Sequence, residues 1–230
     1  MKKLFISLLL TCLASNLSAQ THELGFFTGA TNYIGDIGST AYINPNKFGG
    51  GLVYKYNWNP RIALRGNVSY LPIQGDDLTS NSSFRQSRNN NDGFQFSNRI
   101  FEFAAGIEFN FFNYNIREKE TSFTPYILAQ AAALNYRIVS DYSIDNSVYA
   151  SETTYAIPVG VGIKGKLSGR FAYALESAIR FTFVDDLDFT NNEVFNGNYA
   201  DSGYGNDYYV FTGLSLVYTF GRPPCYAERD

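Results

Sequence analysis

Apolar and polar side chains alternate with a period of two along much of this chain. In the stretch RFAYALESAIRFTF, at residues 170–183, large residues such as Leu175 and Phe181 fall on one side, and Glu176 and Arg180 fall on the other. Alternation of this kind indicates a β-strand whose two faces meet different surroundings. The pattern recurs in segments of about ten residues, the length of a tilted membrane-spanning strand, at 23–34, 47–58, 61–70, 99–111, 124–136, 155–165, 170–183 and 208–220.

The polar side of these segments is small as well as charged, with Ala, Gly and Ser between single charges. In a soluble sandwich the polar face meets water, whereas a small face with scattered charges suits the confined interior of an eight-stranded barrel. The opposite, bulky face suits lipid, where a charge near the midplane costs about 2–4 kcal/mol. Because an unpaired buried charge is costly, we interpret the charges as an ion-paired interior plug rather than as acid–base groups: Lys55, Arg61, Arg65, Glu102, Glu108, Lys164, Glu176 and Arg180.

The connections between segments alternate in length. Short ones at 57–60, 113–121 and 166–170 are interleaved with long polar ones at 35–46, 74–94, 139–152 and 185–207. This asymmetry is typical of outer-membrane barrels, in which short turns face the periplasm. The sequence therefore predicts an all-β fold, an eight-stranded antiparallel up-and-down outer-membrane β-barrel with short periplasmic turns and long extracellular loops, in contact with outer-membrane lipid and with both termini in the periplasm.

Aromatic residues cluster near the ends of the predicted strands. Outer-membrane barrels carry aromatic girdles at both membrane interfaces, and a soluble all-β core would not sort its aromatics in this way. We expect a periplasmic girdle of Tyr56, Trp58, Phe109, Phe111, Tyr126, Phe171, Tyr218 and Phe220, and an outer girdle of Tyr70, Tyr136, Tyr155, Phe181 and Phe183.

The N-terminus has the features of a cleaved export signal. Lys2 and Lys3 precede an apolar run that is too short to span a bilayer, and a cleavage site is expected after Ala19. Lipidation of Cys12 is the alternative, but Thr11 is large for the residue before a lipidated cysteine. The expected organisation is a signal peptide at 1–19, the barrel at 20–220 and a periplasmic tail at 221–230.

Composition limits the classes of function. Removal of the signal leaves a net charge of −5, which argues against nucleic acid as a partner. One cysteine remains, so neither a disulfide framework nor a thiolate zinc cluster is expected. GVGIKGKL at 160–167 has phosphate-loop spacing, but a turn and a strand follow it rather than a helix. His22, the only histidine, is expected outside the strands, and DDLDFTNNE at 185–193 lacks the glycine of a calcium loop. We expect a non-enzymatic protein with no catalytic, cofactor or metal site.

The tail contains the one cysteine of the mature chain, Cys225. An inert thiol on a loose tail is one interpretation, and an intermolecular disulfide in an oxidising compartment is the other. Pro223 and Pro224 favour an extended arm, and Tyr226 offers an aromatic anchor for a partner.

The chain resembles the PorG family of Bacteroidota outer-membrane proteins, most distinctively in NYIGDIG (32–38) and in the ending GRPPCY (221–226). The resemblance implies a barrel of the type IX secretion system, which supports gliding motility in some members. It also implies contact with a periplasmic ring of a PorK/GldK-type lipoprotein and a PorN/GldN-type protein. Carried onto this sequence, the expected ring contact is the tail segment Gly221, Arg222, Pro223, Pro224, Cys225 and Tyr226. The alternative is a generic OmpA- or OmpX-like barrel whose outer loops have structural or adhesive roles.

Overall fold

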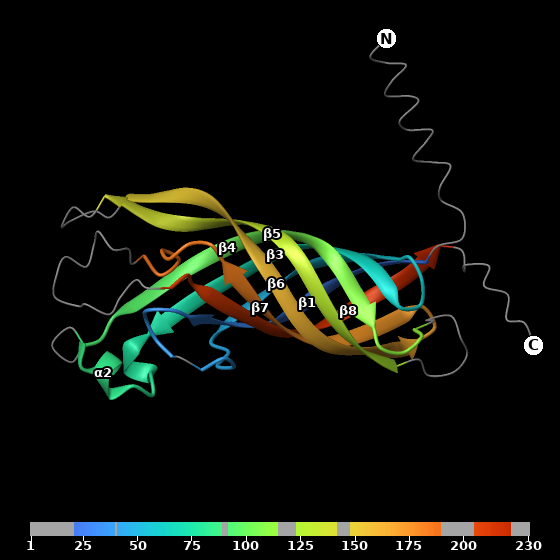
Figure 1. Ribbon diagram of the computed structural model, residues 1–230, viewed down its shortest axis with the longest axis horizontal. Helices are drawn as coiled ribbons and strands as arrows, with labels where there is room; N and C mark the ends of the chain where they lie inside the picture. The colour runs from blue at the N-terminus through green and yellow to red at the C-terminus, as the bar shows by residue number, and fades with distance from the viewer. Residues whose placement is uncertain are drawn as a thin grey trace, which may run out of the picture.

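The computed structural model describes residues 21–39, 41–88, 92–114, 123–141, 148–189 and 205–221. Eight antiparallel strands form one closed barrel in which each strand pairs with its sequence neighbours (Figure 1). Within the described ranges, no helix is long and apolar enough to cross a membrane. The strands are β1 Thr21–Ile34, β2 Lys47–Asn57, β3 Ile62–Asp76, β4 Gln95–Asn110, β5 Phe123–Asp141, β6 Val148–Ser168, β7 Phe171–Thr182 and β8 Tyr208–Gly221.

Closure between the first and last strands completes the barrel. All 14 residues of β1 pair with the 14 residues of β8, from Thr21 opposite Gly221 to Ile34 opposite Tyr208. A closed sheet leaves no edge with unpaired backbone groups, which is the condition for a β-structure to exist in lipid. The predicted eight-stranded up-and-down barrel is confirmed.

The two ends of the barrel differ in their connections (Figure 1). At one end β1 begins, β8 ends and the short turns lie; we call this the short-turn end. There Asn59 closes the β2–β3 turn by accepting hydrogen bonds from the N–H groups of Arg61 and Ile62, and Gly169 supplies the left-handed residue (φ 55°) of the β6–β7 turn. The long-loop end carries the 3-10 helix η1 (Asp77–Thr79) and the short helix α2 (Ser83–Gln86).

The β5–β6 connection differs from the predicted long loop at 139–152. β5 continues to Asp141 and β6 begins at Val148, so most of that segment is a strand hairpin that projects from the long-loop end. Ser151, Glu152 and Thr153 are all exposed. Because both faces of the hairpin meet water there, the alternation of hydrophobicity stops while the backbone pairing goes on.

The outer face of the barrel is apolar along the middle of the strands. Phe103 on β4 is 62% exposed, and Val161 on β6 is 60% exposed. All the predicted girdle aromatics lie at the barrel surface except two. Tyr126 and Tyr136 are each 1% exposed and point inward, so their girdle assignment was wrong. Their hydroxyls donate to carboxylates of Glu176 and Asp186, contacts that an interior position provides and a lipid-facing one does not.

The long-loop half of the interior is an apolar core. Side chains from the strands, among them Leu71, Phe96 and Leu134, pack with Ile37 and Leu187 from the loops. Arg85 of α2 donates to the carbonyls of Gly35 and Gly38, which ties the second loop to the first. The loops therefore form a packed cap over this mouth of the barrel.

Candidate functional site

Among the strand residues whose side chains are described, eight charged ones are buried inside the barrel, four acids and four bases. Seven of the eight residues predicted for the interior network are among them; Glu23 is present instead of Arg61. The network consists of Glu23, Lys55, Arg65, Glu102, Glu108, Lys164, Glu176 and Arg180, each no more than 8% exposed.

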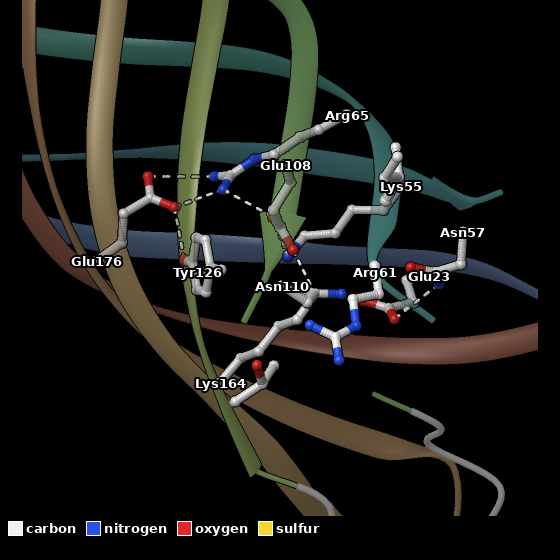
Figure 2. A network of polar contacts seen from close by, with 12 residues as sticks. Glu23, Lys55, Asn57, Arg61, Arg65, Glu108, Asn110, Tyr126, Lys164 and Glu176 are labelled. Carbon is white, nitrogen blue, oxygen red and sulfur yellow. Dashed lines mark hydrogen bonds and ion pairs between the residues drawn. The ribbon is translucent and has the colours of Figure 1, made fainter. Parts of the chain in front are cut away.

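Glu108 on β4 is the centre of the larger cluster (Figure 2). Its Oε2 lies 2.8 Å from Nζ of Lys55 and 3.4 Å from Nη1 of Arg65, and its Oε1 accepts a hydrogen bond from Nζ of Lys164. The carboxylate is fully buried. Three cations from β2, β3 and β6 therefore converge on one acid, and the network joins opposite walls of the barrel.

Arg65 connects this cluster to a second acid. Its guanidinium forms an ion pair with Glu176 on β7, and the Tyr126 hydroxyl donates to the same carboxylate at 2.7 Å (Figure 2). Gly162 leaves room for that tyrosine, because a Cβ on Gly162 would lie 2.5 Å from the Tyr126 ring. The small inward residues of β6 thus make space for large polar side chains of β5.

A separate cluster lies around Glu102. Nε and Nη2 of Arg180 lie 3.3 and 3.4 Å from its carboxylate oxygens, the Tyr209 hydroxyl donates at 2.8 Å, and the Ser69 hydroxyl donates at 3.2 Å. The Arg180 guanidinium also lies 5.6 Å from the ring centroid of Phe211. Glu102 and Arg180 therefore form a second buried ion pair, as the sequence predicts.

Arg61 is the predicted interior residue that the structure places elsewhere. It is exposed at the short-turn end, where its Nε donates to Asn113 and its Nη1 donates to the carbonyl oxygen of Phe111. Arg61 has the same position in the alternation as the inward-facing Ala63 and Arg65. It precedes β3, however, and so lies outside the strand residues that enclose the lumen. The alternation alone therefore assigned it wrongly.

Glu23 was missed by the sequence pattern. Its Oε1 accepts a hydrogen bond from Asn57, and the residue is opposite Lys55 in the β1–β2 register. The segment around it, ELGFFTGA, places glycines inward and two phenylalanines side by side, so it gives no clean alternation. The register with Lys55 is the signal that identifies it.

The prediction that His22 lies outside the strands is wrong. His22 is in β1, opposite Tyr56 and Phe220, and its ring centroid lies 5.4 and 5.5 Å from theirs. Its Nδ1 is 2.8 Å from the Tyr54 hydroxyl. His22 is therefore a member of the aromatic girdle at the short-turn end.

The other predicted motifs are ordinary parts of the fold. GVGIKGKL lies within β6 and leads through a two-residue turn into β7, as predicted, so no helix N-terminus follows it. Gly221 ends β8 opposite Thr21, whereas Arg222 to Tyr226 and the predicted signal peptide at 1–19 lie outside the described residues. Among the residues that the structure describes, no group of three or more His, Cys, Asp or Glu side chains is arranged to hold a metal ion.

The network fills the lumen rather than lining a channel. Beside Arg65 and Glu176 a cavity of about 10 Å³ remains, the space of about one water molecule. Above it, the apolar core and the cap occupy the long-loop half of the described interior. Such an arrangement can stiffen the barrel and narrow a water-filled path at this level of the lumen.

Asp207 fastens the cap directly before β8. Its Oδ2 accepts a hydrogen bond from the N–H of Leu187 at 2.9 Å, and its Oδ1 accepts one from the Tyr33 hydroxyl. The side chain is 1% exposed. Burial, together with the charge of nearby Asp188, raises the pKa of Asp207 to about 9. The neutral acid is therefore the form that holds the cap at pH 7.

We expect the cap to lose stability as the pH rises toward 9. The pKa of Asp207 is higher in the folded protein than the unfolded value of about 3.9, so the folded state binds more protons. Its stabilising contribution is complete below the unfolded pKa and is lost as the pH rises through the folded value of about 9. Asp207→Asn keeps a neutral oxygen acceptor and should flatten the pH dependence of the thermal midpoint; parallel curves for the two proteins would contradict this.

Solved structures with a similar fold are small outer-membrane barrels. Ail, the attachment invasion locus protein of Yersinia pestis, solved with a heparin analogue, is 14% identical (88% of this chain and 99% of that chain, TM-score 0.47). Neisserial surface protein A is 10% identical (87% and 97%, TM-score 0.49). A major outer membrane protein of Thermus thermophilus is 12% identical (88% and 100%, TM-score 0.48).

No curated protein matches the chain. A family model does, over residues 2–229, and its description is a domain of unknown function, DUF6089. The match extends over nearly the whole sequence, and the chain therefore belongs to the DUF6089 family.

Proposed function

We propose that this protein is a non-enzymatic anchor in a bacterial outer membrane, a component of the type IX secretion system that organises the periplasmic ring. The partners in this proposal are a PorK/GldK-type lipoprotein and a PorN/GldN-type ring protein. The short-turn end faces the periplasm, as in other outer-membrane barrels, and the long loops face outward.

The observation that carries the proposal is the combination of an apolar outer wall with a filled interior. A wall with Phe103 and Val161 more than half exposed is suited to acyl chains. The ion-paired side chains around Glu108 occupy the described lumen at this level, which supports a barrel that is closed to solute. A barrel that neither conducts nor encloses a substrate site acts through its two ends, so partner binding is the function that this geometry supports best.

The choice of the periplasmic partner is supported by the sequence resemblance in NYIGDIG and GRPPCY. β8 ends at Gly221, at the same end as the β2–β3 and β6–β7 turns. The tail that follows therefore starts where a periplasmic ring would be within reach. In this proposal residues 221–226 make the contact, and Cys225 forms a disulfide with a ring subunit.

We expect deletion of residues 222–230 to release the ring and impair secretion while the barrel still assembles, because the deletion begins after the last paired residue of β8. Crosslinked envelopes, purified through the barrel and analysed by mass spectrometry, measure ring recovery. Cys225→Ser should abolish a larger species on non-reducing gels. Unchanged ring recovery in the deletion would contradict the proposed contact, and a single unshifted band in the parent would contradict the disulfide.

The second candidate is an adhesive or structural barrel that binds outside partners. The projecting β5–β6 hairpin and the packed cap favour it, since both present ordered backbone at the long-loop end. Replacing the exposed cap residues Leu78 and Phe84, which are 46% and 59% exposed, distinguishes the two. Secretion should be intact under the anchor proposal, whereas outside binding should be lost under the adhesive one.

A further inference from the structure

A trough of about 580 Å³ crosses the outer wall of the barrel over β5 to β8. Its lining is apolar and includes Phe111, Ile127, Val161 and Leu175. The volume is within the range of small-molecule sites, about 300–1,000 Å³. The trough lies on the face that we propose to be in contact with lipid, so its occupant is a molecule of the bilayer.

Two short side chains, Ser177 on β7 and Thr212 on β8, form the far end of the trough. They are opposite each other in the register, and their hydroxyl oxygens lie 2.8 Å apart. This hydrogen bond uses the O–H of one hydroxyl and the oxygen of the other. The neighbouring outward pair on the same two strands is Leu175 and Leu214, whose side chains are larger than those of Ser177 and Thr212. The short pair thus leaves a hollow that the neighbouring apolar rows do not fill.

A basic side chain lies below the trough at the short-turn end of the same two strands. Arg170 is exposed, and its Nη1 donates a 3.0 Å hydrogen bond to the hydroxyl of Tyr218, which is on the outer face of β8. Tyr218 packs edge-on against Phe171, with ring centroids 5.4 Å apart. Among the described residues the other guanidinium N–H groups of Arg170 have no partner, so they are available to an anion at the membrane interface.

The spacing of these two features matches one lipid. Six residues of β7 separate Phe171 from Ser177, about 20 Å at about 3.3 Å per residue. With a tilt of about 45°, this corresponds to roughly half of a hydrocarbon core about 30 Å thick. A headgroup at Arg170 and the end of an acyl chain at Ser177 are therefore separated by the depth of one leaflet.

We propose that this surface binds one glycerophospholipid of the periplasmic leaflet, with its phosphate at Arg170 and Tyr218 and an acyl chain running up the β7–β8 seam into the trough at Ser177 and Thr212. Arginine is well suited to phosphate because its planar guanidinium presents paired donors. The proposal rests on the placement of the barrel in an outer membrane and is independent of the secretion role.

The test uses the full mature chain refolded into vesicles that contain phosphatidylglycerol with a photoreactive diazirine in one acyl chain. Crosslinks should concentrate on Val161 and Leu175. Ser177→Phe, which fills the trough, should lower these crosslinks about tenfold, as expected when a ligand's pocket is occluded. Ala105→Phe is the matched control, since Ala105 is also small and outward-facing but does not line the trough.

Two substitutions of Arg170 test the proposed contact with the lipid headgroup. Arg170→Gln should lower the crosslink yield about tenfold, the usual effect of losing a charge-assisted hydrogen bond, and Arg170→Lys should restore part of it. Crosslinks spread over all outward residues in proportion to exposure, Phe103 included, would overturn the specific site while leaving the membrane placement intact. A complete absence of crosslinks, at Phe103 as well, would overturn the membrane placement and this proposal with it.

Discussion

Glu108→Gln should destabilise the barrel by about 3–5 kcal/mol, the usual cost of removing one partner from a buried ion pair. The substitution keeps the shape of the side chain but removes the negative charge that Lys55, Lys164 and Arg65 share. Two buried ammonium groups would then lack their carboxylate. Urea unfolding of the barrel in phospholipid vesicles measures the loss, followed through the fluorescence of Trp58, the single tryptophan.

Two further variants make this result specific. Glu152→Gln removes the same charge from an exposed position. The free energy of unfolding of this variant should stay within about 0.5 kcal/mol of that of the parent. Lys164→Met in the Glu108→Gln background should recover part of the stability, because it removes an unpaired buried cation. Equal midpoints for Glu108→Gln and the parent would show that the network does not hold the interior together.

Phe103→Arg should prevent or severely weaken assembly into membranes. Phe103 is in the middle of β4 and is 62% exposed on the outer wall. An arginine facing lipid near the midplane costs about 2–4 kcal/mol, in addition to the lost apolar contact. Folding yield into vesicles, read from the shift between folded and unfolded bands on unheated gels, measures the effect.

Phe84→Arg is the control for this change. Phe84 is on α2 and is 59% exposed, nearly the same fraction as Phe103, but it belongs to the cap beyond the strands. In water both substitutions would be tolerated, with changes within about 0.5 kcal/mol. A tolerated Phe103→Arg would therefore contradict the membrane-facing role of the outer wall.

The strand number, the closure and most of the interior charges could be predicted from the sequence because one physical rule governs them. Wherever one face meets lipid and the other a narrow lumen, side-chain size and charge must alternate, as they do around Glu176 and Arg180. The rule ends where the surroundings of the two faces become alike. This is why the hairpin around Ser151 was predicted as a loop, and why Arg61, below the last ring of strand residues, was placed inside.

The parts of the site that the pattern did not predict depend on register between strands. Glu23 belongs to the network because β1 aligns it with Lys55, and its own segment has too many glycines for a clear period. Tyr126 points inward because Gly162 on the next strand leaves space for its ring. Such pairings are properties of two strands together, and a single strand's sequence contains only half of each.

The central claim is that the bulky face of the barrel is in contact with acyl chains, and spin-label accessibility tests it most directly. In a Cys225→Ser background, single labels replace Phe103, Val161 or Phe84 in vesicle-reconstituted protein. Labels at the first two positions should collide with oxygen, which partitions into lipid, far more than with a water-soluble nickel complex, and the label at Phe84 should show the reverse. Nickel access at positions 103 and 161 equal to that at 84 would contradict the claim.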